Sequence, residues 1–189
     1  MKRITFMALA ALVLVSCADR NYSITAEFPI SAGLDGQMFQ LINYDNDEVI
    51  DSVVAVNNRI CFEGKVVKPY AAALKAPSGG QLPFVLESGV IMIDPMGNIS
   101  GTPSNDALRE FKTEMNAVKC DTILTRAEKE TLMTNMLDST FEANKENLVG
   151  YYVFLAIMER KNKVELDSLL KVLPAMYSNS ILVTDRVKF

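Results

Sequence analysis

Hydrophobic and polar residues alternate along most of the first hundred positions, in short runs separated by turn-forming residues. In the first run, Tyr22, Ile24, Ala26 and Phe28 fall on one face. Similar runs cover 38–44, 49–56, 60–62, 66–75, 82–86 and 90–94. Period-two patterning between turns is typical of β-strands and hairpins. The pattern predicts about eight short strands before residue 101, arranged as an antiparallel β-sandwich or open barrel.

Two of the intervening turns carry specific expectations. Asn57-Asn58 is predicted to form a tight turn, because asparagine tolerates a positive φ better than other non-glycine residues. The acid-rich segment 45–48 could offer oxygen ligands to calcium, but it lacks the spaced glycine and distant glutamate of a dedicated calcium loop. We therefore interpret it as a solvated hairpin turn.

The hydrophobic period changes to that of a helix at Thr102. Thr102 offers a capping hydroxyl, and the proline after it suits the first turn of a helix. Thr125 to Glu128 has the sequence of a capping box, which predicts a second helix running to about residue 144. Asn147 is predicted to cap a third helix over 148–158, which is almost entirely apolar and should be buried.

A fourth amphipathic helix is predicted to stop at Pro174, and a last short helix should cover 180–187. The fold class is therefore α+β, with a strand-rich part at 22–101 and a helical subdomain of four to five helices at 102–189.

The N-terminus has the pattern of a signal segment. Lys2 and Arg3 precede an apolar run over 4–15 that is too short to span a bilayer, which needs about 20 residues. The tetrad Leu14-Val15-Ser16-Cys17 resembles the lipobox of bacterial lipoproteins. The resemblance implies cleavage of residues 1–16 and lipidation of Cys17, with 17–21 as anchor and tether. The expected location is the cell envelope, with the outer membrane favoured. The alternative is an ordinary secretory signal in which Cys17 is incidental.

Composition excludes several classes of function. The sequence contains no histidine, which excludes Ser-His-Asp and Cys-His catalysis and removes the commonest metal ligand. The formal net charge is −4, and there is no basic patch to neutralise phosphates, so nucleic acid is not an expected partner. We expect no cofactor, no metal site and no catalytic residues.

Cys61 and Cys120 are the cysteines that remain once Cys17 carries lipid. They form no C-x-x-C motif and are too few for a zinc site. An exported protein meets oxidising conditions, so a Cys61–Cys120 disulfide stays open as the alternative to two idle thiols. Because Ile60 and Phe62 are expected to face the core, Cys61 should lie on the outer face of its strand.

Several short motifs carry a resemblance to a known family. They are Tyr22-Ser23-Ile24, Gly36 before Met38-Phe39-Gln40-Leu41, Ile50-Asp51-Ser52, Ile60-Cys61-Phe62-Glu63-Gly64, Phe84-Val85-Leu86-Glu87 and Gly101-Thr102-Pro103-Ser104-Asn105. Together they resemble the domain of unknown function at the N-terminus of thioredoxin-like thiol-disulfide interchange and alkyl hydroperoxide reductase-type envelope lipoproteins of Gram-negative bacteria. The segments 147–152 and 169–174 resemble the linker helices of that family. The given chain ends at Phe189, about where the thioredoxin-like domain would begin, so no redox activity is assigned to any residue.

These observations lead to a hypothesis and one alternative. The hypothesis is a membrane-anchored, non-enzymatic module that binds a small ligand or an envelope protein. The alternative is an accessory or substrate-docking component for a separate thioredoxin-like protein that acts on disulfides or peroxides. The membrane itself, reached through Cys17, is the remaining expected partner.

Overall fold

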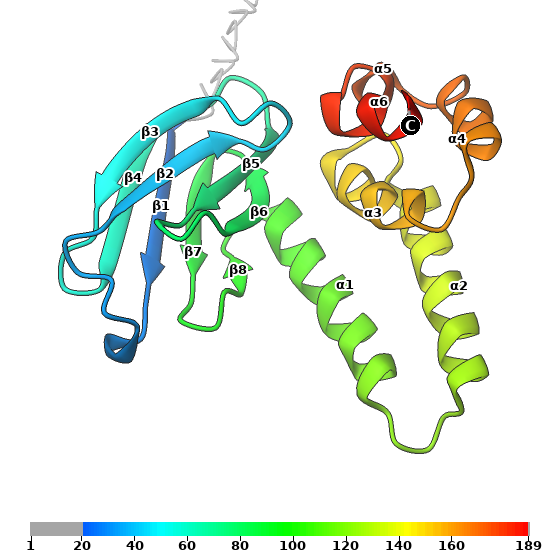
Figure 1. The fold of residues 1–189 in the computed structure, drawn as a ribbon, viewed down its shortest axis with the longest axis horizontal. Helices are drawn as coiled ribbons and strands as arrows, with labels where there is room; N and C mark the ends of the chain where they lie inside the picture. The colour runs from blue at the N-terminus through cyan, green and yellow to red at the C-terminus, as the bar shows by residue number, and fades with distance from the viewer. Residues whose placement is uncertain (1–20, 189) are drawn as a thin grey trace, which may run out of the picture.

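The computed structural model describes residues 21–188, which form a strand-rich half followed by a helical half (Figure 1). The predicted signal peptide and Cys17 lie outside the described residues. The strands are β1 (Asn21–Glu27), β2 (Met38–Asn43), β3 (Val49–Val54), β4 (Arg59–Lys65), β5 (Tyr70–Lys75), β6 (Gln81–Leu86), β7 (Gly89–Ile93) and β8 (Ile99–Ser100). A short 3-10 helix, Ile30–Ala32, follows β1.

The strands form two four-stranded sheets that pack face to face without closing into a barrel. One sheet has the order β4-β1-β7-β8 and the other the order β3-β2-β5-β6. Alternate side chains fill the space between them, as the period-two pattern requires. In β4, for example, Ile60 and Phe62 are buried, whereas Arg59, Cys61 and Glu63 are exposed. The predicted sandwich and the predicted outer position of Cys61 are therefore confirmed.

One strand pairing differs from the antiparallel expectation. β1 pairs antiparallel with β4, which places Ile24 opposite Phe62, but it pairs parallel with β7, which places Ile24 opposite Ile91. Parallel neighbours need a long crossover rather than a hairpin, and here the rest of the sandwich supplies it. The direction of β7 is therefore set by a connection that local patterning does not reveal.

The turn at Asn57-Asn58 forms as predicted. Both residues have positive φ values, 53° and 56°, and Val56 and Arg59 form a β-bridge across them. The expected strand over 66–75 is shorter than predicted, because β5 begins at Tyr70 and residues 66–69 form the connection from β4.

The helical half contains six α-helices within the described residues. They are α1 (Pro103–Cys120), α2 (Arg126–Asn144), α3 (Leu148–Met158), α4 (Lys163–Leu170), α5 (Ala175–Ser178) and α6 (Ile181–Lys188). The prediction of four to five helices missed the single turn of α5, which follows Pro174. α1 and α2 form a long hairpin, and the four later helices gather at one end of it (Figure 1).

The predicted burial of α3 is confirmed. Phe154 is fully buried, and its ring lies 5.5 Å from that of Phe141 and 5.0 Å from that of Tyr177. Aromatic pairs at these distances add to the stabilisation from burial alone. Among residues 21–188, none of the helices has the length and apolar character needed to cross a membrane.

Candidate functional site

The helical half is attached to the outer edge of strand β6 through Asn105. This side chain, only 2 % exposed, accepts a hydrogen bond from the Val85 amide at 3.0 Å and donates one to the Val85 carbonyl at 2.8 Å. An edge strand otherwise presents unpaired backbone groups. Asn105 thus takes the place of a neighbouring strand, and α1 closes this side of the sheet.

The start of α1 is also held by Glu87, in the turn between β6 and β7. Its carboxylate accepts hydrogen bonds from the Ser104 amide at 2.8 Å and from the Ser104 hydroxyl at 2.9 Å. The prediction that the Thr102 hydroxyl caps this helix is wrong. The hydroxyl makes no hydrogen bond to the helix backbone and instead accepts one from the Asn105 side chain at 2.8 Å. A carboxylate from the sandwich therefore satisfies the first turn of the helix.

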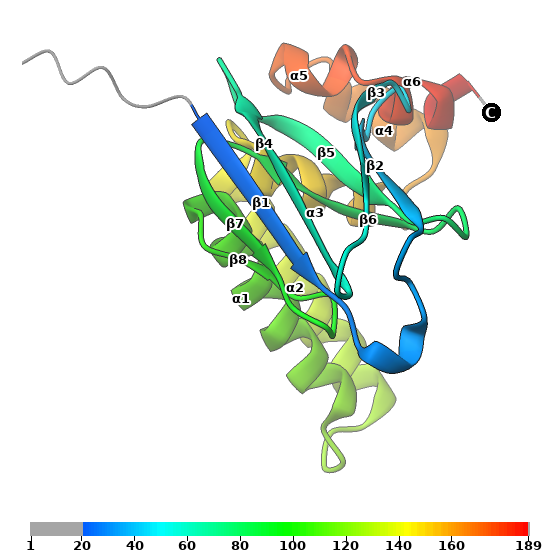
Figure 2. The same cartoon turned by 90° about the vertical axis from the view of Figure 1, so that its left-hand side faces the viewer.

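A third connection comes from α3, which lies behind β5 and β6 in Figure 2. The Tyr152 hydroxyl donates to the Phe84 carbonyl at 2.6 Å, and the Ala72 carbonyl lies 3.3 Å away. Burial raises the pKa of Tyr152 well above its ordinary value, so this hydroxyl keeps its proton and remains a donor.

Asp45 makes the most extensive of these connections, and its role corrects our interpretation of the turn at 45–48. Its carboxylate accepts hydrogen bonds from the Ser180 hydroxyl at 2.6 Å, from the amides of Ile181 and Leu182 at 2.9 and 3.2 Å, and from the Tyr151 hydroxyl at 3.3 Å. A carboxylate at a helix N-terminus is stabilised by the free amides and by the helix dipole. Asp45 therefore caps α6 from the β-rich half. Within residues 21–188, no three Cys, Asp or Glu side chains gather as a metal site would require.

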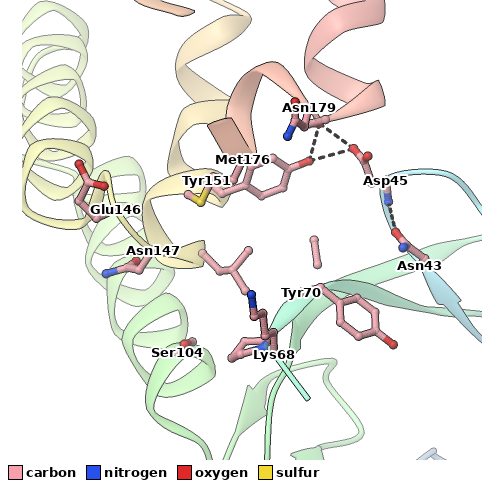
Figure 3. A pocket seen from close by; sticks show the side chains of 14 residues that line it. Asn43, Asp45, Lys68, Tyr70, Ser104, Glu146, Asn147, Tyr151, Met176 and Asn179 are labelled. Atoms are coloured by element: carbon pink, nitrogen blue, oxygen red, sulfur yellow. Dashed lines mark hydrogen bonds between the residues drawn. The ribbon is translucent and has the colours of Figure 1, made fainter. Parts of the chain in front are cut away.

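A cavity of about 590 Å³ lies between the two halves, beside the Asp45 contacts and the start of α1 (Figure 3). The β-rich half contributes the end of β2 and the connection into β5, and the helical half contributes the starts of α1 and α3 and the α5–α6 segment. The lining residues are Asn43, Asp45, Lys68, Pro69, Tyr70, Ala71, Ser104, Glu146, Asn147, Leu148, Tyr151, Met176, Asn179 and Ser180. The volume falls in the range of about 300–1,000 Å³ that is usual for small-molecule sites.

Hydrogen bonds between the two halves hold part of the cavity wall in place. The Tyr151 hydroxyl lies 3.0 Å from the Ser180 hydroxyl as well as near Asp45. Asn147 caps α3 as predicted, because its side-chain oxygen accepts from the amides of Val149 and Gly150. Glycine is required at position 150, since a Cβ there would overlap the Asn144 carbonyl oxygen.

The chemistry of the cavity suits recognition. Burial, the largest effect, raises the pKa of Tyr151 to about 12, so its hydroxyl is neutral at physiological pH. The Asp45 carboxylate is already occupied by four donors. Leu148 and Met176 supply apolar surface, and the exposed Lys68 brings a cationic head to the lining. The arrangement offers apolar contact, amide groups and charge, which together orient a ligand.

The cysteines identified in the sequence lie outside this cavity. Cys61 and Cys120 are both free, exposed thiols in the structure, so the disulfide left open by the sequence is not formed there. The Cys61 sulfur lies 3.8 Å from the hydroxyl of Thr25 on the neighbouring strand β1. Neither thiol belongs to the bonded network at the junction of the two halves.

Residues 22–108 match a family model described as a domain of unknown function (DUF4369). The match runs from the second residue of β1 through β8 to the beginning of α1, including Asn105. The resemblance of this part of the chain to a domain of unknown function is therefore confirmed. No curated protein and no solved structure shows a significant match to the chain.

Sequence reasoning missed the contacts that join the two halves. Asn105 belongs to one of the motifs that resemble the known family. An asparagine so near the start of a helix could have suggested a contact between the helix and the strands. Asp45 and Ser180 are 135 residues apart, and no local signal links an acidic turn to the cap of so distant a helix.

Proposed function

We propose that this protein is a lipid-anchored protein of the cell envelope whose body is a non-enzymatic binding module. The observation that carries the proposal is the cavity of about 590 Å³ between the β-rich and helical halves. The ligand site is this cavity, and the anchor is Cys17. The outer membrane is the proposed location.

The state of the polar groups in the cavity supports binding rather than catalysis. General acid–base catalysis works best with a group whose pKa lies near the working pH. The Tyr151 hydroxyl, with its pKa near 12, holds its proton too tightly to act as a base. The Asp45 carboxylate is committed to the N-terminus of α6. The chain also contains no histidine to take that role.

Native mass spectrometry of protein extracted from its own membranes tests the binding role. We expect a small molecule to remain with the wild-type protein and to be lost from Met176→Trp, which fills the cavity. Met96→Trp is the matched control, because Met96 is 86 % exposed and is not part of the cavity lining. An empty wild-type protein that instead crosslinks to a thioredoxin-like protein would replace the proposal with the accessory role.

The anchor has its own test. Cys17→Ser should abolish lipidation and leave the unprocessed precursor, because the thiol is the atom that receives the lipid. The measurement is the intact mass of the membrane-extracted protein. An unmodified Cys17 in the wild type would contradict the anchoring.

A further inference from the structure

An exposed loop lies at the end of the sandwich where β1 begins. Asn21, the first residue of β1, pairs with Lys65, the last residue of β4. The chain then runs through residues 66–69 into β5, and Val67 in this loop is 71 % exposed. Lys65 and Lys68, on either side, are exposed as well, and neither belongs to an ion pair within the described residues.

The proposed anchor places this loop next to a bilayer. Only four residue steps separate Cys17 from Asn21, and four extended residues span at most about 14 Å. The end of the sandwich that holds Asn21 therefore stays within that distance of the lipid attached to Cys17. Because Lys65 is the direct neighbour of Asn21, the loop is held near the lipid surface too.

We propose that the loop formed by residues 65–69 contacts the membrane surface that holds Cys17. Val67 enters the headgroup region, and the ammonium groups of Lys65 and Lys68 lie beside anionic phospholipid headgroups. An apolar side chain between two lysines suits this interface, because the long lysine side chains keep their charges in the polar layer. Glu63, exposed two residues before Lys65, limits how closely β4 itself approaches anionic lipid. This inference rests on the proposed lipidation of Cys17.

The same contact fixes the orientation of the molecule. The far end of the sandwich, at the turn between β7 and β8, carries Met96, which is 86 % exposed. β1 has seven residues, so the two ends lie about 20 Å or more apart. Lys68 and Pro69 also line the cavity, so the ligand site lies at the membrane-facing end of the protein.

Fluorescence quenching in lipid nanodiscs tests the proposal with the full lipidated chain. Cys61 and Cys120 are first replaced by serine, and one new cysteine, Val67→Cys or Met96→Cys, receives an environment-sensitive dye. The nanodiscs contain phosphatidylcholine and phosphatidylglycerol, with or without a lipid that carries a nitroxide quencher near its headgroup. The dye at position 67 should be quenched at least threefold more than the dye at position 96, and its emission should shift to the blue.

The charge contribution has a separate readout. Lys65→Gln/Lys68→Gln, made together in the chain labelled at position 67, should reduce quenching in discs with phosphatidylglycerol and leave it nearly unchanged in discs of phosphatidylcholine alone. Equal quenching at positions 67 and 96 in protein whose mass shows an acylated Cys17 would overturn the membrane contact and leave the anchor intact. A mass that shows an unmodified Cys17 would overturn the proposed anchoring, and with it this inference.

Discussion

Removing the Asn105 side chain should weaken the joint between the two halves more than any comparable change on the surface of α1. Asn105→Ala deletes both hydrogen bonds to the Val85 backbone and the bond to the Thr102 hydroxyl. Val85 is fully buried, so water cannot replace the lost partners without opening the edge of the sheet. Two backbone groups are then left unsatisfied in a site without solvent.

The size of the effect follows from these groups. A buried polar group without a partner costs about 1–3 kcal/mol, and partial relaxation of α1 should reduce the combined cost of the two groups. The higher helix propensity of alanine compared with asparagine offsets up to about 0.7 kcal/mol of this loss in stability. We therefore expect Asn105→Ala to lower the free energy of unfolding by about 2–4 kcal/mol. Asn105→Asp should do no better, because it keeps the acceptor for the Val85 amide but sets a carboxylate against the Val85 carbonyl.

Urea unfolding followed by circular dichroism measures the loss, and hydrogen exchange locates it. The Val85 amide should exchange much faster in Asn105→Ala than in the wild type. Asn116→Ala, an exposed asparagine on the same helix, is the matched control; it should not destabilise the protein and should change stability only by the gain in helix propensity, up to about 0.7 kcal/mol. A loss below about 1 kcal/mol, or an unchanged exchange rate at Val85, would refute the role assigned to Asn105.

Three further predictions concern other parts of the fold. Phe154→Ala should lower the free energy of unfolding by about 3–5 kcal/mol in urea melts, because its ring is fully buried. Thr125→Ala should lower it by about 1 kcal/mol, because the exposed capping box is lost. Equal losses would contradict the central position of α3. In the same melts, Cys61→Ser should leave stability nearly unchanged and Phe62→Ala should lower it strongly, since the two side chains lie on opposite faces of β4. A larger loss for Cys61→Ser than for Phe62→Ala would mean that the register of β4 is wrong. Stability should fall as the pH rises from about 10 to 12, because folded Tyr151 holds its proton up to a pKa of about 12 while the unfolded chain releases it near 10.0. Tyr151→Phe should reduce that fall, and an unchanged pH dependence in this variant would argue against its burial.

Local patterns were sufficient for most of the secondary structure. The alternation over 22–94 predicted the strands, and the asparagine pair at 57–58 predicted a turn with positive φ. The capping box at Thr125 and the cap at Asn147 both form with the expected bonds. Each of these features depends on residues within a few positions of one another, so the backbone geometry and the cap follow from the local sequence.

Tertiary structure alone decided how the two halves are joined and where the cavity lies. The parallel pairing of β1 with β7, the bonds of Asn105 to Val85 and the capping of α6 by Asp45 all connect residues that are far apart in the chain. A carboxylate in a polar turn looks the same in the sequence whether it faces water or a helix of another part of the molecule. Asp45 finds its partners only when the two halves pack together and bring the free amides of α6 within hydrogen-bonding distance. The carboxylate then satisfies the helix N-terminus in place of water.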